Sequence, residues 1–283
     1  MEQATRAEHW RYLFAIAYRM LGTVHEAEDA VQEAYLRFEE AAPEDVRSTR
    51  AYLSTLVTRI SIDRLRSAAR NREKYVGPWL PEPIVTEQDP AEGADSDSLS
   101  LAFLVVLESL NPVERAVFLL REVFGYEHAE IAHVVERSEP NVRQIAHRAR
   151  EAVAARRPKF EIAPHKKREI GERFLDALRR LDIPQMLTML DDEVTLRSDG
   201  GGVVQAARRP IVGPDKVARF LVGISSFEYD AVEVAFNGQP GMAVLVGGQV
   251  FAAVSIDLRG DRIRDIFIVV NPEKLAAIRE EVG

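Results

Sequence analysis

The residue types most suited to reading a nucleic acid lie between Tyr126 and Arg150. Residues 127–135 are expected to form one short helix and residues 136–138 a turn, with Ser138 as the N-cap of a second helix. The apolar residues of this second helix share one face, while Arg and Gln side chains, which can reach base edges and phosphates, occupy the other. A surface helix with solvated charges is the alternative. The candidate contact residues are Ser138, Asn141, Arg143, Gln144, His147, Arg148 and Arg150.

A second basic segment covers residues 47–75, with eight Lys and Arg against two Asp and Glu. Helical spacing places Arg59, Arg66 and Arg70 on one side, with Arg64 adjacent and Asp63 beside it. Such a cationic stripe suits the phosphate backbone of DNA. A solvated helix face is again the alternative.

An acidic helix precedes this basic segment. It places Asp29, Gln32 and Glu33 on one face. Acidic residues near a helix start commonly complement the helix dipole, so this face by itself indicates little.

The composition of the chain excludes several kinds of functional site. The chain has 283 residues, a net charge of -8, 46% hydrophobic residues and no cysteine, which excludes disulfides, thiolate metal sites and a cysteine nucleophile. No metal-ligand spacing is found, and no cofactor or metal is expected. The chain start lacks the pattern of a signal peptide, and no apolar run approaches the ~20 residues that span a bilayer. A cytoplasmic location and no membrane partner are therefore expected.

The segments that carry these residues are predicted to be helical, with a linker between them. Residues 1–75 show apolar residues at helical spacing. Residues 76–98 contain four prolines and six acidic residues without a base, which predicts a linker. Residues 99–160 are helical again, and Asn111-Pro112-Val113-Glu114 has the composition of a helix start.

From residue 166 onward, the sequence pattern changes from helical to a mixture of helices and strands. Helices are expected at 166–181, 184–190 and near 214–223, and β-rich runs are expected at 194–197, 228–236, 242–246, 249–258 and 263–270. Helices that lead into a curved antiparallel sheet predict an α+β domain.

In this order the segments resemble a bacterial sigma factor of the extracytoplasmic-function (ECF) group, over about residues 8–157. The resemblance of residues 28–33 to region 2.2 implies that Asp29, Gln32 and Glu33 bind core RNA polymerase. Residues 47–75 resemble regions 2.3 and 2.4, which open and read the -10 element. Residues 110–126, 130–132 and 142–150 are similar to region 4, which reads the -35 element of promoter DNA in the major groove.

Three further motifs resemble signatures of the SigJ-like group of sigma factors, which carry a fused SnoaL-like (NTF2-like) cone domain. They are Trp79-Leu80-Pro81-Glu82-Pro83, Asp199-Gly200-Gly201-Gly202 and Asn271-Pro272-Glu273-Lys274-Leu275. Local alternatives are a rigid turn, a tight β-turn and a helix N-cap. The chain departs from the group at Val203, where a Lys often follows the glycines, although Arg208 and Arg209 lie nearby.

The resemblance implies a multidomain protein: two all-α sigma domains, the second a helix-turn-helix, followed by the α+β domain. The expected boundaries are 1–75 for region 2, 76–98 for the linker, 99–160 for region 4 and 166–283 for the SnoaL-like domain. That last domain is expected to regulate the sigma domains in cis, by intramolecular contacts. The expected contact residues are Trp79, Pro81, Pro83, Asp199, Gly200, Gly201, Gly202, Asn271, Pro272, Lys274 and Leu275.

An enzyme fused to a DNA-binding unit is the competing hypothesis, because SnoaL-like relatives include cyclases and isomerases. The six histidines lie at positions 9, 25, 128, 133, 147 and 165, so a pocket in the last domain would rely on Asp176, Asp199 or Asp257. These acids also suit turns, caps and surfaces, and no catalysis is expected. A pocket that binds an unknown small ligand and shifts the regulatory balance is a third alternative.

Overall fold

The computed structural model describes residues 3–41, 48–72, 75–86, 97–156, 162–225 and 227–282. Within these ranges, the side chains of residues 3–8, 69–72 and 164 are not described. The chain divides into two compact units, one made of residues 1–73 and 106–158 and the other of residues 74–105 and 159–283. In the described part, no helix is long and apolar enough to cross a membrane.

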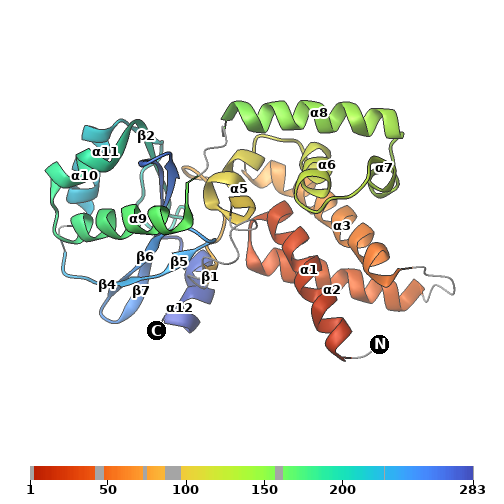
Figure 1. Cartoon of the computed structure of the whole chain (residues 1–283). Helices are drawn as coiled ribbons and strands as arrows, with labels where there is room; N and C mark the ends of the chain where they lie inside the picture. The colour runs from red at the N-terminus through yellow and green to blue at the C-terminus, as the bar shows by residue number, and fades with distance from the viewer. Residues whose placement is uncertain are drawn as a thin grey trace. The chain divides into compact units, whose positions relative to one another are not determined.

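The first half of unit 1 consists of three helices that pack against one another: α1 (Gln3–Leu21), α2 (Val24–Ala41) and α3 (Thr49–Arg72). Figure 1 shows them in red and orange. The buried face of α2 carries Ala27, Ala30 and Ala34, all fully buried, and such small side chains let neighbouring helices approach closely. The helices predicted from the apolar spacing are confirmed.

The second half of unit 1 consists of α6 (Pro112–Glu122), α7 (His128–Val135) and α8 (Glu139–Arg156). The predicted start of α6 is a capping box: Asn111 Oδ1 accepts from the backbone N–H of Glu114 at 3.0 Å, and Asn111 N–H donates to the Glu114 carboxylate at 3.1 Å. The helix-turn-helix arrangement of α7 and α8 is also confirmed. The residues of α8 that pack inward are Val142, Ile145, Ala146, Ala149 and Val153.

Unit 2 contains a six-stranded sheet of order β3-β2-β8-β7-β6-β4 and a two-stranded sheet of β1 and β5. The helices α9, α10 and α11 precede or interrupt the large sheet, and α5 spans the division between the units. The bounds are α5 (Leu101–Leu107), α9 (Pro164–Arg179), α10 (Ile183–Met189), α11 (Pro214–Ile224), η2 (Pro272–Leu275) and α12 (Ala276–Val282) for the helices, and β1 (Val85–Thr86), β2 (Leu190–Asp199), β3 (Ile211–Val212), β4 (Asp230–Glu233), β5 (Ala235–Phe236), β6 (Gly241–Val246), β7 (Gln249–Arg259) and β8 (Arg262–Val269) for the strands.

The prediction of an antiparallel sheet is wrong for one pair of strands. β2 runs parallel to β8, whereas the pairs β2–β3, β4–β6, β6–β7 and β7–β8 are antiparallel. Parallel neighbours need a long connection rather than a hairpin, and more than 60 residues separate β2 from β8 here. The alternation of side chains along each strand does not distinguish the two directions.

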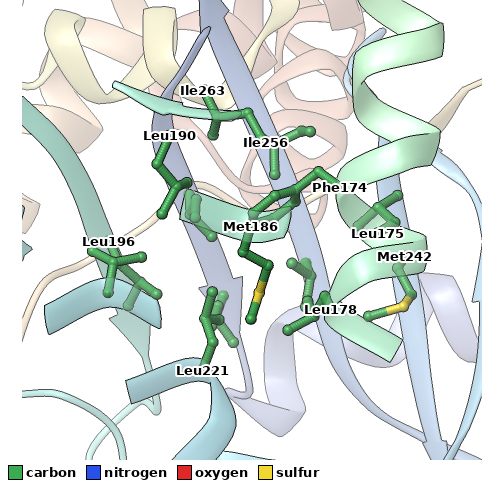
Figure 2. Close-up of a cluster of buried hydrophobic side chains, with 14 of the residues drawn as sticks. Phe174, Leu175, Leu178, Met186, Leu190, Leu196, Leu221, Met242, Ile256 and Ile263 are labelled. Atoms are coloured by element: carbon green, nitrogen blue, oxygen red, sulfur yellow. The ribbon is translucent and has the colours of Figure 1, made fainter. Parts of the chain in front are cut away.

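The first face of the large sheet packs against α9, α10 and α11. Sheet residues such as Val254, Ile256 and Ile266 meet Phe174 of α9 and Met186 of α10 in one apolar cluster. Figure 2 shows side chains of this cluster, among them Phe174, Met186 and Ile256, between the helices and the sheet. The interior of this α+β domain is therefore a packed apolar core.

The second face of the sheet is covered by segments that are distant in sequence. The side chains of β8 alternate between the two faces, so Phe267 and Val269 lie on this second face. They pack against Leu80, Leu101 and Leu275. Residues 76–86, which the sequence predicts as part of a linker, are thus integral to the core of unit 2. Their apolar and proline side chains bury surface that the sheet would otherwise expose to water.

Candidate functional site

The three SigJ-like motifs meet at the carboxylate of Asp199, which has no exposed surface. Its Oδ1 accepts hydrogen bonds from the Tyr75 hydroxyl at 2.6 Å and the Gly201 N–H at 2.9 Å. Its Oδ2 accepts from the Leu80 N–H at 2.9 Å and from Lys274 Nζ at 2.7 Å. The buried charge is therefore paired and hydrogen-bonded, as burial requires.

Lys274 joins the C-terminal segment to the linker. Its ammonium group, buried at 6% exposure, also donates to the Leu80 carbonyl. The same group lies 4.2 Å from the ring centroid of Trp79 and 5.4 Å from that of Tyr75. An aromatic face stabilises a desolvated cation, so Lys274 has both anionic and aromatic partners.

Asn271 connects the glycine-rich turn to the same group of residues. Its Oδ1 caps η2 by accepting from the Glu273 N–H at 3.1 Å, and its Nδ2 donates to the Tyr75 hydroxyl at 3.3 Å. Burial and the hydrogen bond to Asp199 raise the pKa of Tyr75 well above its usual value, so this hydroxyl remains a donor at neutral pH. We call the seven residues Tyr75, Trp79, Leu80, Asp199, Gly201, Asn271 and Lys274 the Asp199 cluster.

The remaining motif residues lie around this cluster. Pro81, Pro83 and Gly200 are buried, and Gly202 is exposed beside Val76. Pro272 is the first residue of η2, and Leu275 packs against the second face of the sheet.

A second contact holds the linker at Asn237, which is fully buried. Asn237 exchanges hydrogen bonds with the backbone of Ile84, receiving at 3.0 Å and donating at 2.9 Å. Its Nδ2 donates to the Leu99 carbonyl at 3.1 Å. One side chain thus binds the chain on both sides of residues 87–96, in the linker at Ile84 and just after it at Leu99.

Sequence reasoning missed Tyr75 and Asn237. Tyr75 ends the basic segment 47–75, and Asn237 precedes Gly238 in a pair that is typical of a tight turn. The turn signal is correct, since Asn237 has a φ of 55°, but a local pattern does not show what its side chain contacts.

The polar face of α8 is exposed as predicted. Ser138 precedes the helix, and its exposed residues include Asn141, Arg143, Gln144, His147, Arg148 and Arg150. Two of the arginines have acidic partners: Arg143 pairs with Glu139 at 2.5 Å and Arg150 with Glu122 at 2.6 Å. Both arginines are nevertheless exposed, so this face of α8 remains accessible to the phosphates of a nucleic acid.

The basic residues of α3 do not form one continuous stripe. Arg66 is exposed and pairs with Asp63 at 3.0 Å, and the side chain of Arg70 lies outside the described residues. Arg59 instead donates to the backbone carbonyls of His133 at 2.8 Å and Val134 at 2.9 Å, at the end of α7. Two donor groups of Arg59 are thus engaged within unit 1, and its contact with DNA stays a prediction.

Arg64 lies with the acidic residues of α2. Its Nη2 donates to Glu33 at 3.0 Å, and its Nη1 lies 3.8 Å from an Asp29 oxygen. Gln32 is exposed on the same helix. The structure thus places one residue predicted to read the -10 element among those predicted to bind polymerase.

Comparisons with known proteins agree with this organisation. The family model described as Sigma-70 region 2 matches residues 7–71, and the one described as Sigma-70, region 4 matches residues 100–153. ECF RNA polymerase sigma factor SigJ of Mycobacterium tuberculosis is 36% identical over 93% of this chain and 90% of its own length. Probable ECF RNA polymerase sigma factor SigI of the same species is 30% identical over 97% of this chain and 95% of its own length.

The fold comparison gives the same result over the whole chain. The crystal structure of Mycobacterium tuberculosis SigJ matches with a TM-score of 0.79 and 31% identity, and it covers 97% of this chain and 99% of that one. The predicted fold class is therefore confirmed: sigma region 2 and region 4 helical domains with a C-terminal α+β NTF2-like domain. The chain belongs to the extracytoplasmic-function RNA polymerase sigma factors, and it is an alternative sigma factor that recognises promoters.

Proposed function

We propose that this sigma factor binds core RNA polymerase through α2, reads the -35 element with α8, and is regulated in cis by its C-terminal domain through the Asp199 cluster. The relatives named above are RNA polymerase sigma factors, and this chain matches them over nearly their whole length. This match supports core polymerase and promoter DNA as partners. The observation that carries the regulatory part is the convergence of three distant motifs on one buried carboxylate.

Physical reasoning supports a role of the linker in this regulation. The first stretch of unit 1 ends at residue 73. Residues 75–86, which follow it, are hydrogen-bonded to Asp199 and Asn237 of unit 2. The conformations open to the two sigma domains therefore depend on whether those contacts form. A tethered domain acts at an effective concentration near the millimolar range, so contacts of modest strength suffice to control the linker.

The packing of the C-terminal domain favours regulation over catalysis. None of the three carboxylates considered for general base chemistry points into the apolar core: Asp199 accepts four hydrogen bonds outside it, and Asp176 pairs with Arg180 at 2.6 Å on the exposed side of α9. Asp257 follows Ile256 on β7, so alternation directs it to the opposite face. A general base must reach its substrate. From these positions, none of the three carboxylates can reach a substrate bound in the interior of the α+β domain.

Run-off transcription with purified core polymerase and selected promoter fragments tests both parts of the proposal. We expect the full-length chain to direct initiation and to co-elute with core polymerase. We also expect Lys274→Met and Trp79→Leu to change promoter activity by about fivefold or more, because each removes a contact of the Asp199 cluster. Circular dichroism would establish that the sigma helices of both variants remain folded.

Lys216→Met is the matched control, because Lys216 is exposed on α11 of the same domain. It should leave transcription unchanged. Activity equal to that of the unaltered chain in both cluster variants would remove the regulatory proposal. The absence of both initiation and co-elution for the unaltered chain would contradict the polymerase proposal itself.

A further inference from the structure

A groove of about 550 Å³ lies between α2 and α3. Its charged lining includes Glu26, Asp29, Glu33 and Asp63, together with the arginines Arg37 and Arg64. The groove thus combines Asp29 and Glu33, two of the three residues predicted to bind polymerase, with Asp63 and Arg64, which are predicted to read the -10 element. Acidic groups predominate on its walls, which favours a basic surface as the partner.

Arg64 is the residue of α3 that connects the two walls. Besides the contacts to Glu33 and Asp29 described above, its Nη1 donates to the Glu26 carbonyl at 3.1 Å. The Arg64 side chain is only 28% exposed, whereas that of Arg66 on the same helix is 55% exposed. The guanidinium group therefore has three partners on α2: hydrogen bonds to Glu26 and Glu33, and a longer ion pair with Asp29.

We propose that Arg64 is a positioning residue of the polymerase-binding surface, which holds Asp29 and Glu33 in the arrangement that a basic surface of core RNA polymerase binds. This inference rests on the proposed function, and it assigns Arg64 to polymerase binding instead of to the -10 element.

The spacing of the two carboxylates explains why they need a positioning residue. Asp29 and Glu33 are four residues apart on one helix, where like charges repel each other. The planar guanidinium group carries several donors in a fixed fork, so it offsets this repulsion and fixes both side chains. Partial burial acts to raise the pKa of Glu33, but the hydrogen bonds and charges of Arg64 and Arg37 outweigh burial and lower it. Glu33 therefore remains ionised.

The sign of the effect separates positioning from simple electrostatics. If only net charge mattered, loss of a cation from an acidic surface would strengthen its attraction to a basic partner. If Arg64 positions the carboxylates, its loss leaves them free to adopt other rotamers, and binding must then supply the cost of ordering them. The two accounts predict opposite changes in affinity.

The experiment measures the affinity of the full-length chain for purified core RNA polymerase without DNA, by fluorescence anisotropy. We expect Arg64→Met to weaken binding roughly tenfold. Arg64→Lys, which keeps the charge but loses the fork, should give an intermediate value. In a double-mutant cycle, Glu33→Gln should cost much less in the Arg64→Met background than in the unaltered chain.

Arg156→Met is the control for charge, because Arg156 is an exposed arginine at the end of α8 that donates to the Ala152 carbonyl of its own helix. It should leave core affinity unchanged. Equal or tighter binding of Arg64→Met would overturn the inference while leaving the proposed function intact. If Arg64→Met does not fold, unchanged affinity of Arg64→Lys overturns the inference and weakened affinity supports it. Failure of the unaltered chain to bind core polymerase would overturn both.

Discussion

At the scale of single residues, the glycine-rich turn is explained by space. Gly201 has a φ of 64°, and a Cβ at this position would lie 2.6 Å from side-chain atoms of Asn271. A Cβ on Gly200 would lie 2.1 Å from the Val204 carbonyl oxygen. Both distances are far below van der Waals contact. Both glycines are therefore needed for close packing, and Gly201 is also needed for the left-handed conformation of the turn.

The first prediction compares Gly201→Ala with Gly260→Ala. Gly260 has a φ of 61° with no atom within 4 Å of an added Cβ, so its substitution measures backbone strain, about 1 kcal/mol. Gly201→Ala must also displace Asn271, and we expect it to lower the free energy of unfolding by roughly a further 1–3 kcal/mol. Urea denaturation of the two variants measures the difference. Equal losses would mean that Asn271 can move aside without cost.

At the scale of elements, α8 owes its orientation to its apolar face. Buried side chains such as Val142 and Ala149 fix the helix against its own domain, and the opposite face is left polar. The charged residues on that face are not equivalent. Arg150 is bonded twice to Glu122 of α6, and this pairing raises its pKa, whereas Arg148 is exposed elsewhere on the same helix.

The second prediction concerns that face. Arg148→Ala should weaken promoter binding by the complex with core polymerase at all salt concentrations, and should reduce the slope of log affinity against log salt by about 1 if Arg148 meets a phosphate. Filter binding over a salt series measures this slope. Arg156→Ala serves as the control at the far end of α8. An unchanged slope for Arg148→Ala would exclude a phosphate contact at this residue.

At the scale of the molecule, the two sigma domains within unit 1 are joined by a pair of arginines. Arg59 of α3 donates to the last carbonyls of α7, and Arg115 of α6 donates to the Met20 carbonyl in the last turn of α1 at 2.8 Å. A cation is favourable at the C-terminus of a helix. Tyr12 adds a 3.3 Å hydrogen bond to Tyr126.

If α3 reads the -10 element and α8 the -35 element, as the sequence predicts, these contacts do not allow both elements to be read at once. The names of the elements place them roughly 25 base pairs apart, or about 85 Å at 3.4 Å per base pair. Direct hydrogen bonds between α3 and α7 do not allow that separation. We infer that the domains of unit 1 separate when the sigma factor binds polymerase.

The third prediction follows from this separation. Fluorescent labels on α2 and α8 should show high energy transfer in the free chain and low transfer after core polymerase is added. Arg59→Met should lower the transfer of the free chain, because it removes the bonds to α7. Arg66→Met, on the same helix, should not. Equal transfer with and without polymerase would contradict the opening of unit 1.

The helices, the helix-turn-helix, the capping box at Asn111 and most of the strands could be predicted from the sequence. These features depend on short-range patterns: the period of the apolar residues, the residue at a cap and the glycines of the turns. The exposed face of α8 was predictable for the same reason, because the buried positions of one helix define its free side.

Tertiary structure alone decided the parallel pairing of β2 with β8, the incorporation of residues 75–86 into the core of unit 2, and the partners of Arg59 and Arg64. Tyr75 and Asp199 are separated by 124 positions, and Arg64 and Glu33 by 31. No local pattern contains such pairs. They meet because burial of apolar surface brings their elements together, and a buried or half-buried charge then takes the partners that it finds there.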